Sequence, residues 1–102
     1  MKVVLSARVE ADIVNQLSYD ISAYGKKTAE RTFARVDIFL NRFLISYPRA
    51  GWKLAQCDLY ETWIARTPFV VIYCVDDEAE IVTVLALFHH ARDRSDFEPD
   101  KT

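Results

Sequence analysis

Two apolar runs, FVVIYCV at residues 69–75 and IVTVLALF at residues 81–88, decide how this chain folds. Both runs are rich in β-branched and aromatic residues, which favour strands, and only the five residues DDEAE separate them. So short a connection favours an antiparallel pair. Because the runs are nearly continuous rather than alternating, we expect two central strands, 69–75 and 80–89, covered on both faces of a sheet.

Two more strand-like segments precede these runs, at 52–57 and 59–66, with breaks at Asp58 and Thr67. With such short connections, the four strands predict an antiparallel meander. A further short strand of β-branched and aliphatic residues, 2–6, stands at the start of the chain.

Between the first strand and the meander, apolar residues recur at steps of three and four, which predicts two helices in an antiparallel hairpin. The first helix spans about 7–25, with Ser6 as its cap and Gly25 as its end. The second begins at a capping Thr28 and stops at Pro48. The stripes expected to face the core are Val9, Ile13, Leu17, Ile21 and Tyr24 in the first helix, and Ala29, Phe33, Val36, Leu40, Phe43 and Tyr47 in the second.

These elements predict one α+β domain over residues 1–102, with residues 91–102 as a C-terminal tail. A chain of 102 residues can bury one modest core but not two. The expected architecture is an N-terminal strand, then an antiparallel helical hairpin packed on one face of an antiparallel β-sheet. The opposite face also needs a cover, for which the tail or a partner protein is the candidate.

The net charge of −2 conceals an uneven distribution of charge along the chain. Residues 26–53 carry seven Lys and Arg against two acids, whereas residues 58–102 carry four against ten. A protein that held nucleic acid by its phosphates over a broad surface would have a positive balance. General nucleic-acid binding is therefore disfavoured.

A few residues indicate the cellular compartment of the protein and whether it binds a metal. Residues 1–6 hold one positive charge and a short apolar run, so we expect neither a signal peptide nor a membrane-spanning helix. Cys57 and Cys74 lack CxxC spacing and are expected to be small core hydrophobes in a reducing cytosol. His89 and His90 lack a matching ligand spacing. The sequence predicts a cytoplasmic protein without metal or cofactor.

The order of strand, helical hairpin and antiparallel meander resembles the RelE/ParE toxin fold over almost the whole chain, and in particular its ParE-like branch. This resemblance implies a toxin of a type II toxin–antitoxin system. The matching motifs are VLSA at 4–7 followed by ADI at 11–13, YG at 24–25 followed by TA at 28–29, YPRAG at 47–51, PFVVIY at 68–73 and LFHHAR at 87–92.

The resemblance implies one of two activities, both neutralised by a cognate antitoxin. ParE-like members bind DNA gyrase and block it without being enzymes, whereas RelE-like members cleave mRNA on the ribosome. Some of the ribonucleases are similar in carrying an Arg two or three residues before the strand tyrosine, but here Val70 and Val71 precede Tyr73. Gyrase inhibition is therefore the main expectation, and ribonuclease activity or a homologue without toxicity are the alternatives.

The ribonuclease alternative has a defined set of candidate residues. His89 would transfer a proton during attack of a 2′-hydroxyl on phosphate, and Arg66, Lys53 and Arg92 would stabilise charge if they converged with it. Neighbouring strand residues point to opposite faces, so only one of His89 and His90 can serve a given site. The opposing interpretation is that both are strand-end residues with ordinary hydrogen-bond partners.

The second helix predicts a binding surface, because its side opposite the core carries arginines interleaved with apolar residues. Such a side can anchor a partner, although it can also be an ordinary solvated helix face. The expected antitoxin contacts are Arg31, Arg35, Ile38, Arg42 and Ile45, together with Trp63 if it is exposed.

Trp52 and Trp63 are otherwise expected to pack on the sheet. In ParE-like relatives the C-terminal segment contributes to toxicity. The resemblance therefore implies that Arg92, Arg94 and Phe97 contact the target.

Overall fold

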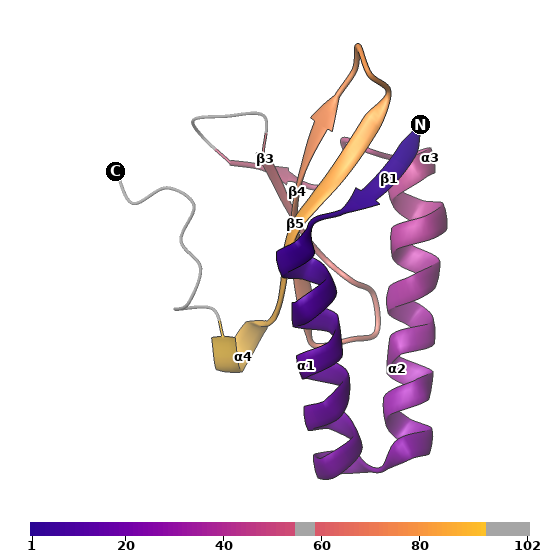
Figure 1. Cartoon of the computed structure of the whole chain (residues 1–102). Coiled ribbons are helices and arrows are strands. Elements are labelled where there is room, and N and C mark those ends of the chain that lie inside the picture. The colour runs from indigo at the N-terminus through magenta and orange to yellow at the C-terminus, as the bar shows by residue number, and fades with distance from the viewer. Residues whose placement is uncertain (55–58, 94–102) are drawn as a thin grey trace.

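The computed structural model describes residues 1–54 and 59–93, in which a helical hairpin lies on one face of a five-stranded sheet (Figure 1). The helical segments are α1 (Ala7–Tyr24), α2 (Lys26–Ile38), the π-helical turn η1 (Phe39–Phe43), α3 (Leu44–Ser46) and α4 (His90–Asp93). The strands are β1 (Lys2–Leu5), β2 (Trp52–Lys53), β3 (Leu59–Trp63), β4 (Phe69–Asp76) and β5 (Ile81–His89).

The sheet has the strand order β1-β5-β4-β3-β2. Strands β2 to β5 form the predicted antiparallel meander. Strand β1 adds to the edge of β5 in parallel, with Lys2 opposite Ile81 and Leu5 opposite Val84, so the complete sheet is mixed. Since parallel neighbours need a long crossover, the hairpin between β1 and the meander supplies it and covers one face on the way. The predicted α+β architecture is confirmed.

The ends of α1 follow from two residues. The Ser6 hydroxyl accepts a hydrogen bond from the Val9 N–H at 3.2 Å, which confirms the predicted cap. Gly25, with φ 92° and ψ 158°, has a conformation that is essentially reserved for glycine, and α2 begins at the next residue. The predicted cap at Thr28 was therefore wrong, because Gly25 turns the chain sharply enough to be the N-cap of α2 itself, three residues earlier.

The π-helical turn η1 changes which residues of the second helix face the core. The Leu44 N–H bonds to the Phe39 carbonyl, five residues back, so this turn holds one more residue than an α-helical turn. As a result Leu44 is fully buried, while Phe43 is 38% and Tyr47 60% exposed. The prediction that Phe43 and Tyr47 lie in the core was wrong for this reason.

The far end of α1 also departs from the expected stripe. Val9 is fully buried and Ile13 packs against the core, but Ile21 and Tyr24 are exposed. In Figure 1 the turn between α1 and α2 lies well away from the strands, so this end of the hairpin has no sheet to cover. Periodicity alone does not reveal where the sheet stops.

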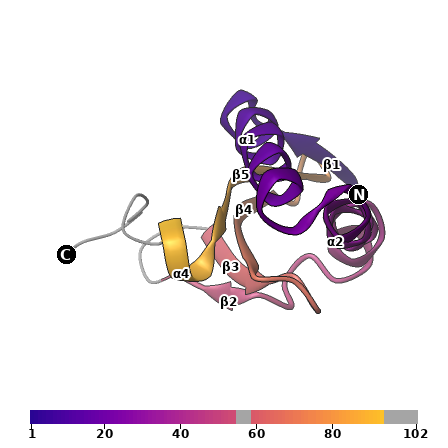
Figure 2. The same cartoon turned by 90° about the horizontal axis from the view of Figure 1, so that it is seen from below.

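The central strands are buried on both faces, as predicted. The helices α1 and α2 lie on the same side of the central strands (Figure 2). On this face β4 contributes Phe69, Val71 and Tyr73, all fully buried. The opposite face holds a second cluster of buried residues, Val70, Ile72, Ala86 and Phe88, with Leu54 and Leu59 packed against it.

Strand β5 contains a bulge that the start of α1 stabilises. Ile72 pairs with Ala86 but Tyr73 with Val84, which leaves Leu85 as the extra residue. The Leu85 carbonyl accepts a hydrogen bond from the Ser6 hydroxyl at 3.3 Å, and the Leu87 N–H donates to the Asp12 carboxylate at 3.3 Å. The backbone groups next to the bulge therefore have hydrogen-bond partners at the start of α1. Because of the extra residue, even-numbered side chains of β5 face the hairpin before the bulge and the opposite side of the sheet after it.

Two remaining expectations concern the cysteines and membranes. Cys74 is a free, partly buried thiol, while Cys57 lies outside the described residues. None of the helices described is long and apolar enough to cross a bilayer.

Candidate functional site

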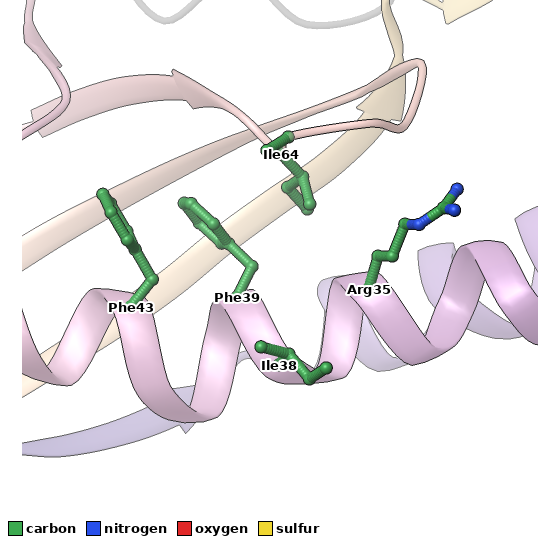
Figure 3. A pocket seen from close by; sticks show the side chains of 6 residues that line it. Arg35, Ile38, Phe39, Phe43 and Ile64 are labelled. Carbon is green, nitrogen blue, oxygen red and sulfur yellow. The ribbon is translucent and has the colours of Figure 1, made fainter.

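The second helical segment and the turn after β3 enclose a cavity of about 210 Å³ (Figure 3). One wall comes from α2 and η1, and the facing wall comes from the residues that follow β3. The lining residues are Arg35, Ile38, Phe39, Phe43, Ile64 and Ala65, which we call the α2 groove.

The π-helical turn accounts for the shape of the α2 groove. Phe39 and Phe43, at its two ends, stack with their ring centroids 5.0 Å apart at 19°. In Figure 3 both rings project from the helix toward the chain segment that bears Ile64, directly after β3. Because Leu44 takes the core position, Phe43 remains 38% exposed and forms a wall, above a base made of the buried Phe39 and Ile64. The groove is therefore lined by apolar side chains held in fixed positions.

The facing turn is organised by its own hydrogen bonds. The Thr67 hydroxyl donates to the Ile64 carbonyl at 2.9 Å and accepts from the Phe69 N–H at 3.1 Å. Arg66 adopts the left-handed region, with φ 64°, and its carbonyl accepts a hydrogen bond from the Arg35 guanidinium at 3.2 Å. Arg35 thus ties the two walls together at one end of the groove.

The rim of the α2 groove is cationic. Arg31 lies one helical turn before Arg35 on the same side of α2, Arg42 belongs to η1 next to Phe43, and both Arg31 and Arg42 are exposed. At about 100° per residue, the acidic Asp37 points away from this side, and its carboxylate accepts a hydrogen bond from Asn41 at 2.7 Å. A partner that places carboxylates over the rim would meet the positive charge of these arginines.

The predicted antitoxin contacts divide into two groups. Arg31, Arg35, Ile38, Arg42 and Ile45 follow one another along α2, η1 and α3, and Ile38 is 53% and Ile45 37% exposed. Trp63 does not join them. Its neighbour Ile64 faces the hairpin side of the sheet, so Trp63 points to the other side, where its ring lies 4.2 Å from that of His90.

Sequence reasoning missed the apolar lining of the groove. It placed Phe43 in the core and gave no role to Phe39, Ile64 or Ala65. The one available signal was the adjacent pair Phe39-Leu40, where strict helical periodicity expects only one apolar residue to face the core.

The residues of the ribonuclease alternative do not all converge. His89 lies at the end of β5, with its ring edge-on to Phe69 and its Nδ1 accepting a hydrogen bond from the Ala91 N–H at 3.2 Å. Lys53 lies on β2, opposite Tyr60. Strands β2 and β5 are three strand spacings apart, so their backbones are separated by roughly 14 Å across the sheet. Any difference in position along the strands adds to this distance. Lys53 and His89 therefore cannot contact one phosphate.

The other residues of that set lie closer to His89. Arg66 belongs to the turn between β3 and β4, at the same end of the sheet, and Arg92 belongs to α4, directly after β5. Of the predicted target contacts, Arg92 is in α4, whereas Arg94 and Phe97 lie outside the described residues.

The chain segment that leads into β2 is fixed by two contacts. The Arg49 guanidinium pairs with the Asp77 carboxylate at 3.0 Å, a hydrogen bond that raises the pKa of Arg49. The Gly51 N–H donates to the Tyr73 hydroxyl at 3.1 Å, and a Cβ at Gly51 would lie only 2.6 Å from that oxygen. Burial raises the pKa of Tyr73. This segment therefore has a defined path up to Trp52.

The two tryptophans do not pack inside the sheet as expected. Trp52 is 80% and Trp63 51% exposed. The prediction was wrong because β2 is only two residues long and stands at the sheet edge, where no further strand covers its side chains within the described residues.

Comparison with known proteins identifies the family. The family described as the ParE toxin of the type II toxin–antitoxin system parDE matches residues 3–94 of this chain. A search of curated protein sequences found no significant match.

The chain is also similar to solved structures over most of its length. One belongs to the chromosomal ParDE toxin–antitoxin system of P. aeruginosa, with 14% identity, a TM-score of 0.67, and coverage of 87% of this chain and 95% of that one. Another belongs to the toxin–antitoxin complex RelBE2 of Mycobacterium tuberculosis, with 22% identity, a TM-score of 0.65, and coverage of 86% and 95%. A third, from the intact E. coli RelBE complex, has 15% identity, a TM-score of 0.51, and coverage of 84% and 92%. At such identities the structures establish a shared fold, and the match over residues 3–94 establishes more: this chain belongs to the ParE toxin family of type II toxin–antitoxin systems.

Proposed function

We propose that this toxin acts by binding and inhibiting DNA gyrase, without being an enzyme, and that a cognate antitoxin neutralises it by placing a segment in the α2 groove. The observation that carries the proposal is an apolar cavity of about 210 Å³ with a cationic rim. A groove of this kind provides binding energy and charge selectivity but no reactive group.

The exposure of the groove supports a partner protein. Ile38 and Phe43 are 53% and 38% exposed, and Arg35 and Arg42, which can hold carboxylates, are close to them along the helix. Apolar residues flanked by arginine are typical of interface centres, because the arginine stem packs while its guanidinium pairs with an acid. The similar structures from P. aeruginosa, M. tuberculosis and E. coli are described as parts of toxin–antitoxin systems or complexes, and this makes an antitoxin the natural occupant.

The spacing of the ribonuclease candidates supports a non-enzymatic mechanism. Lys53 and His89 are too far apart to act on one phosphate, and His89 is engaged with Phe69 and the Ala91 N–H. Arg66 and Arg92 lie at the His89 end of the sheet but Lys53 does not, so the four candidate residues do not assemble as one set around a phosphate. Under this proposal the gyrase contacts come from Arg92, Arg94 and Phe97, and the complex acts in the cytoplasm.

The experiment that tests the proposal is a gyrase supercoiling assay with the purified chain, titrated with and without its antitoxin. Dose-dependent inhibition, relieved by one equivalent of antitoxin, is the expected result. Active gyrase that stays unaffected by folded toxin would overturn the target assignment. A ribosome-dependent mRNA cleavage assay with His89→Ala as the matched variant then separates the alternatives, because loss of growth arrest in that variant indicates a ribonuclease. Growth unaffected by inducible expression of the wild-type chain indicates a homologue without toxicity.

A further inference from the structure

The edge of the sheet away from the hairpin places an acid between two tryptophans. In the pairing of β2 with β3, Trp52 stands directly opposite Glu61, and Trp63 follows Glu61 by two residues on the same face of β3. Directly opposed side chains have their Cβ atoms roughly 5 Å apart, and residues two apart on a strand are roughly 7 Å apart. The three side chains, which we call the aromatic edge, are therefore immediate neighbours.

The aromatic edge is both exposed and held in place. Trp52 and Trp63 are 80% and 51% exposed, although tryptophan is among the most buried residue types on average. The Trp63 ring is backed by His90 at 4.2 Å, and Trp52 follows directly after Gly51, whose N–H is bonded to Tyr73. An exposed ring that is already held, as Trp63 is by His90, loses little side-chain freedom on binding a partner, which is characteristic of interface anchors.

The charge at the aromatic edge selects the chemistry of the partner. A carboxylate next to two indoles suits a guanidinium group, which can stack on an indole face while donating hydrogen bonds to the acid. It does not suit a nucleic acid, whose bases could stack but whose phosphates would meet Glu61.

We propose that Trp52, Glu61 and Trp63 form a receptor for an arginine side chain of a partner protein, and that this partner is the target of the toxin. The α2 groove lies on the hairpin face of the sheet and has a cationic rim, whereas the aromatic edge lies on the other face and carries an acid. The two surfaces can therefore hold different proteins of opposite charge. The assignment of this partner as the target rests on the proposed function, but the arginine receptor does not.

The receptor is tested by NMR titration of the full chain with N-acetyl-arginine amide, following the indole N–H signals of the two tryptophans. Both signals should shift with rising ligand concentration, and the uncharged N-acetyl-norleucine amide should shift them far less. Glu61→Gln should weaken the affinity for the arginine probe about fivefold, whereas Glu78→Gln, an equal change of charge at an exposed turn, should not. Equal shifts with both probes, or no effect of Glu61→Gln, would overturn the receptor.

The target assignment is tested by growth arrest and by antitoxin binding in the same variants. Trp52→Ala should raise the inducer concentration that is required for growth arrest at least tenfold, and Trp52→Phe should raise it less. Neither variant should change antitoxin binding. Full arrest by a folded Trp52→Ala variant overturns the assignment while leaving the receptor intact. If the wild-type chain fails to inhibit gyrase yet arrests growth in a Trp52-dependent manner, the gyrase proposal is wrong. The assignment of the aromatic edge as the surface that binds the target is then retained.

Discussion

The α2 groove and the aromatic edge are both apolar surfaces beside charged groups, but they are built in opposite ways. The groove is concave and depends on two irregular features of the backbone, the π-helical turn of Phe39–Phe43 and the left-handed Arg66. The edge depends on the regular pairing of β2 with β3 and on the His90 ring that lies against Trp63. The groove has arginines at its rim and the edge has an acid at its centre. One small domain can therefore present two surfaces that exclude each other's partners by charge.

The largest expected effect concerns the helix that supports the groove. Leu44→Ala should lower the free energy of unfolding by about 3 kcal/mol, because Leu44 is fully buried, whereas Phe43→Ala should lower it by only about 1 kcal/mol. Urea unfolding measures both. A larger loss in the Phe43 variant would mean that η1 is an ordinary α-helical turn and that the groove has no structural basis.

The charge of the rim is the next largest determinant. Arg31→Glu combined with Arg42→Glu should weaken antitoxin binding about 100-fold, because carboxylates of the partner would then face like charges. The matched control, Lys26→Glu combined with Lys27→Glu, changes the net charge equally at the turn between α1 and α2. Isothermal titration at two salt concentrations gives the affinities. Equal losses in both double variants would show that net charge, rather than the groove, attracts the antitoxin.

A variant that fills the cavity should show how much the shape of the α2 groove, apart from its charge, contributes to antitoxin binding. Ala65 is exposed and lines the groove, so Ala65→Phe should occupy the cavity and weaken antitoxin binding about tenfold without lowering the melting temperature. Ala79→Phe, at an exposed turn, is the matched control. Undiminished binding by Ala65→Phe would contradict an apolar anchor in this cavity.

Tyr73 connects the core to the aromatic edge through Gly51. Tyr73→Phe removes the hydrogen bond that the Gly51 N–H makes to the hydroxyl and should lower the free energy of unfolding by about 1 kcal/mol at neutral pH. Burial raises the pKa of Tyr73 in the folded state because it penalises the phenolate, so this group leaves the free energy of unfolding of the wild type unchanged below about pH 10. The free energy of unfolding then falls as pH rises from there through the folded pKa, because the unfolded chain releases the proton first.

Urea unfolding at pH 8 to 11.5 should therefore show a steeper alkaline decline in the wild type than in Tyr73→Phe. Parallel declines would mean that the Tyr73 hydroxyl is not desolvated in the folded state.

The smallest expected effect belongs to the edge itself. Trp52→Ala should change the free energy of unfolding by less than about 0.5 kcal/mol, because the side chain is 80% exposed. Thermal unfolding measures this change. A loss above about 2 kcal/mol would indicate that Trp52 is a packing residue and would remove the contrast between the two surfaces.

Sequence periodicity predicted the elements of the fold but not its irregular features. The spacing of apolar residues by three and four positions predicted both helices. The two apolar runs predicted β4 and β5 to within a residue or two. The segment FLNRF contains no Gly or Pro, so nothing in it distinguishes a π-helical turn from an α-helical one. Its extra residue is decided by tertiary packing, which lets both Phe39 and Leu44 reach the core.

The candidate sites show the same limit. The arginines and isoleucines of the second helix were predicted to share one side from regular helical geometry, which holds as far as Ile38 but is altered by η1 before Ile45. The placement of Trp63 on the other face from the groove depends on the pairing of β3 and on where the strand ends. Likewise, Trp52 lies next to Glu61 only because of the register between β2 and β3, and sequence patterns do not specify that register.

The parallel pairing of β1 with β5 sets the order in which the chain can fold as it is synthesised. The residues of β1 find their partners about 79 positions later, so at typical translation rates β1 emerges roughly 4 to 16 s before β5 does. The helical hairpin, whose contacts are local, can form during that interval, but it has no complete sheet to pack against. Closing the sheet is therefore a late event, and the α2 groove and the aromatic edge mature together once β5 has joined β1 to the meander.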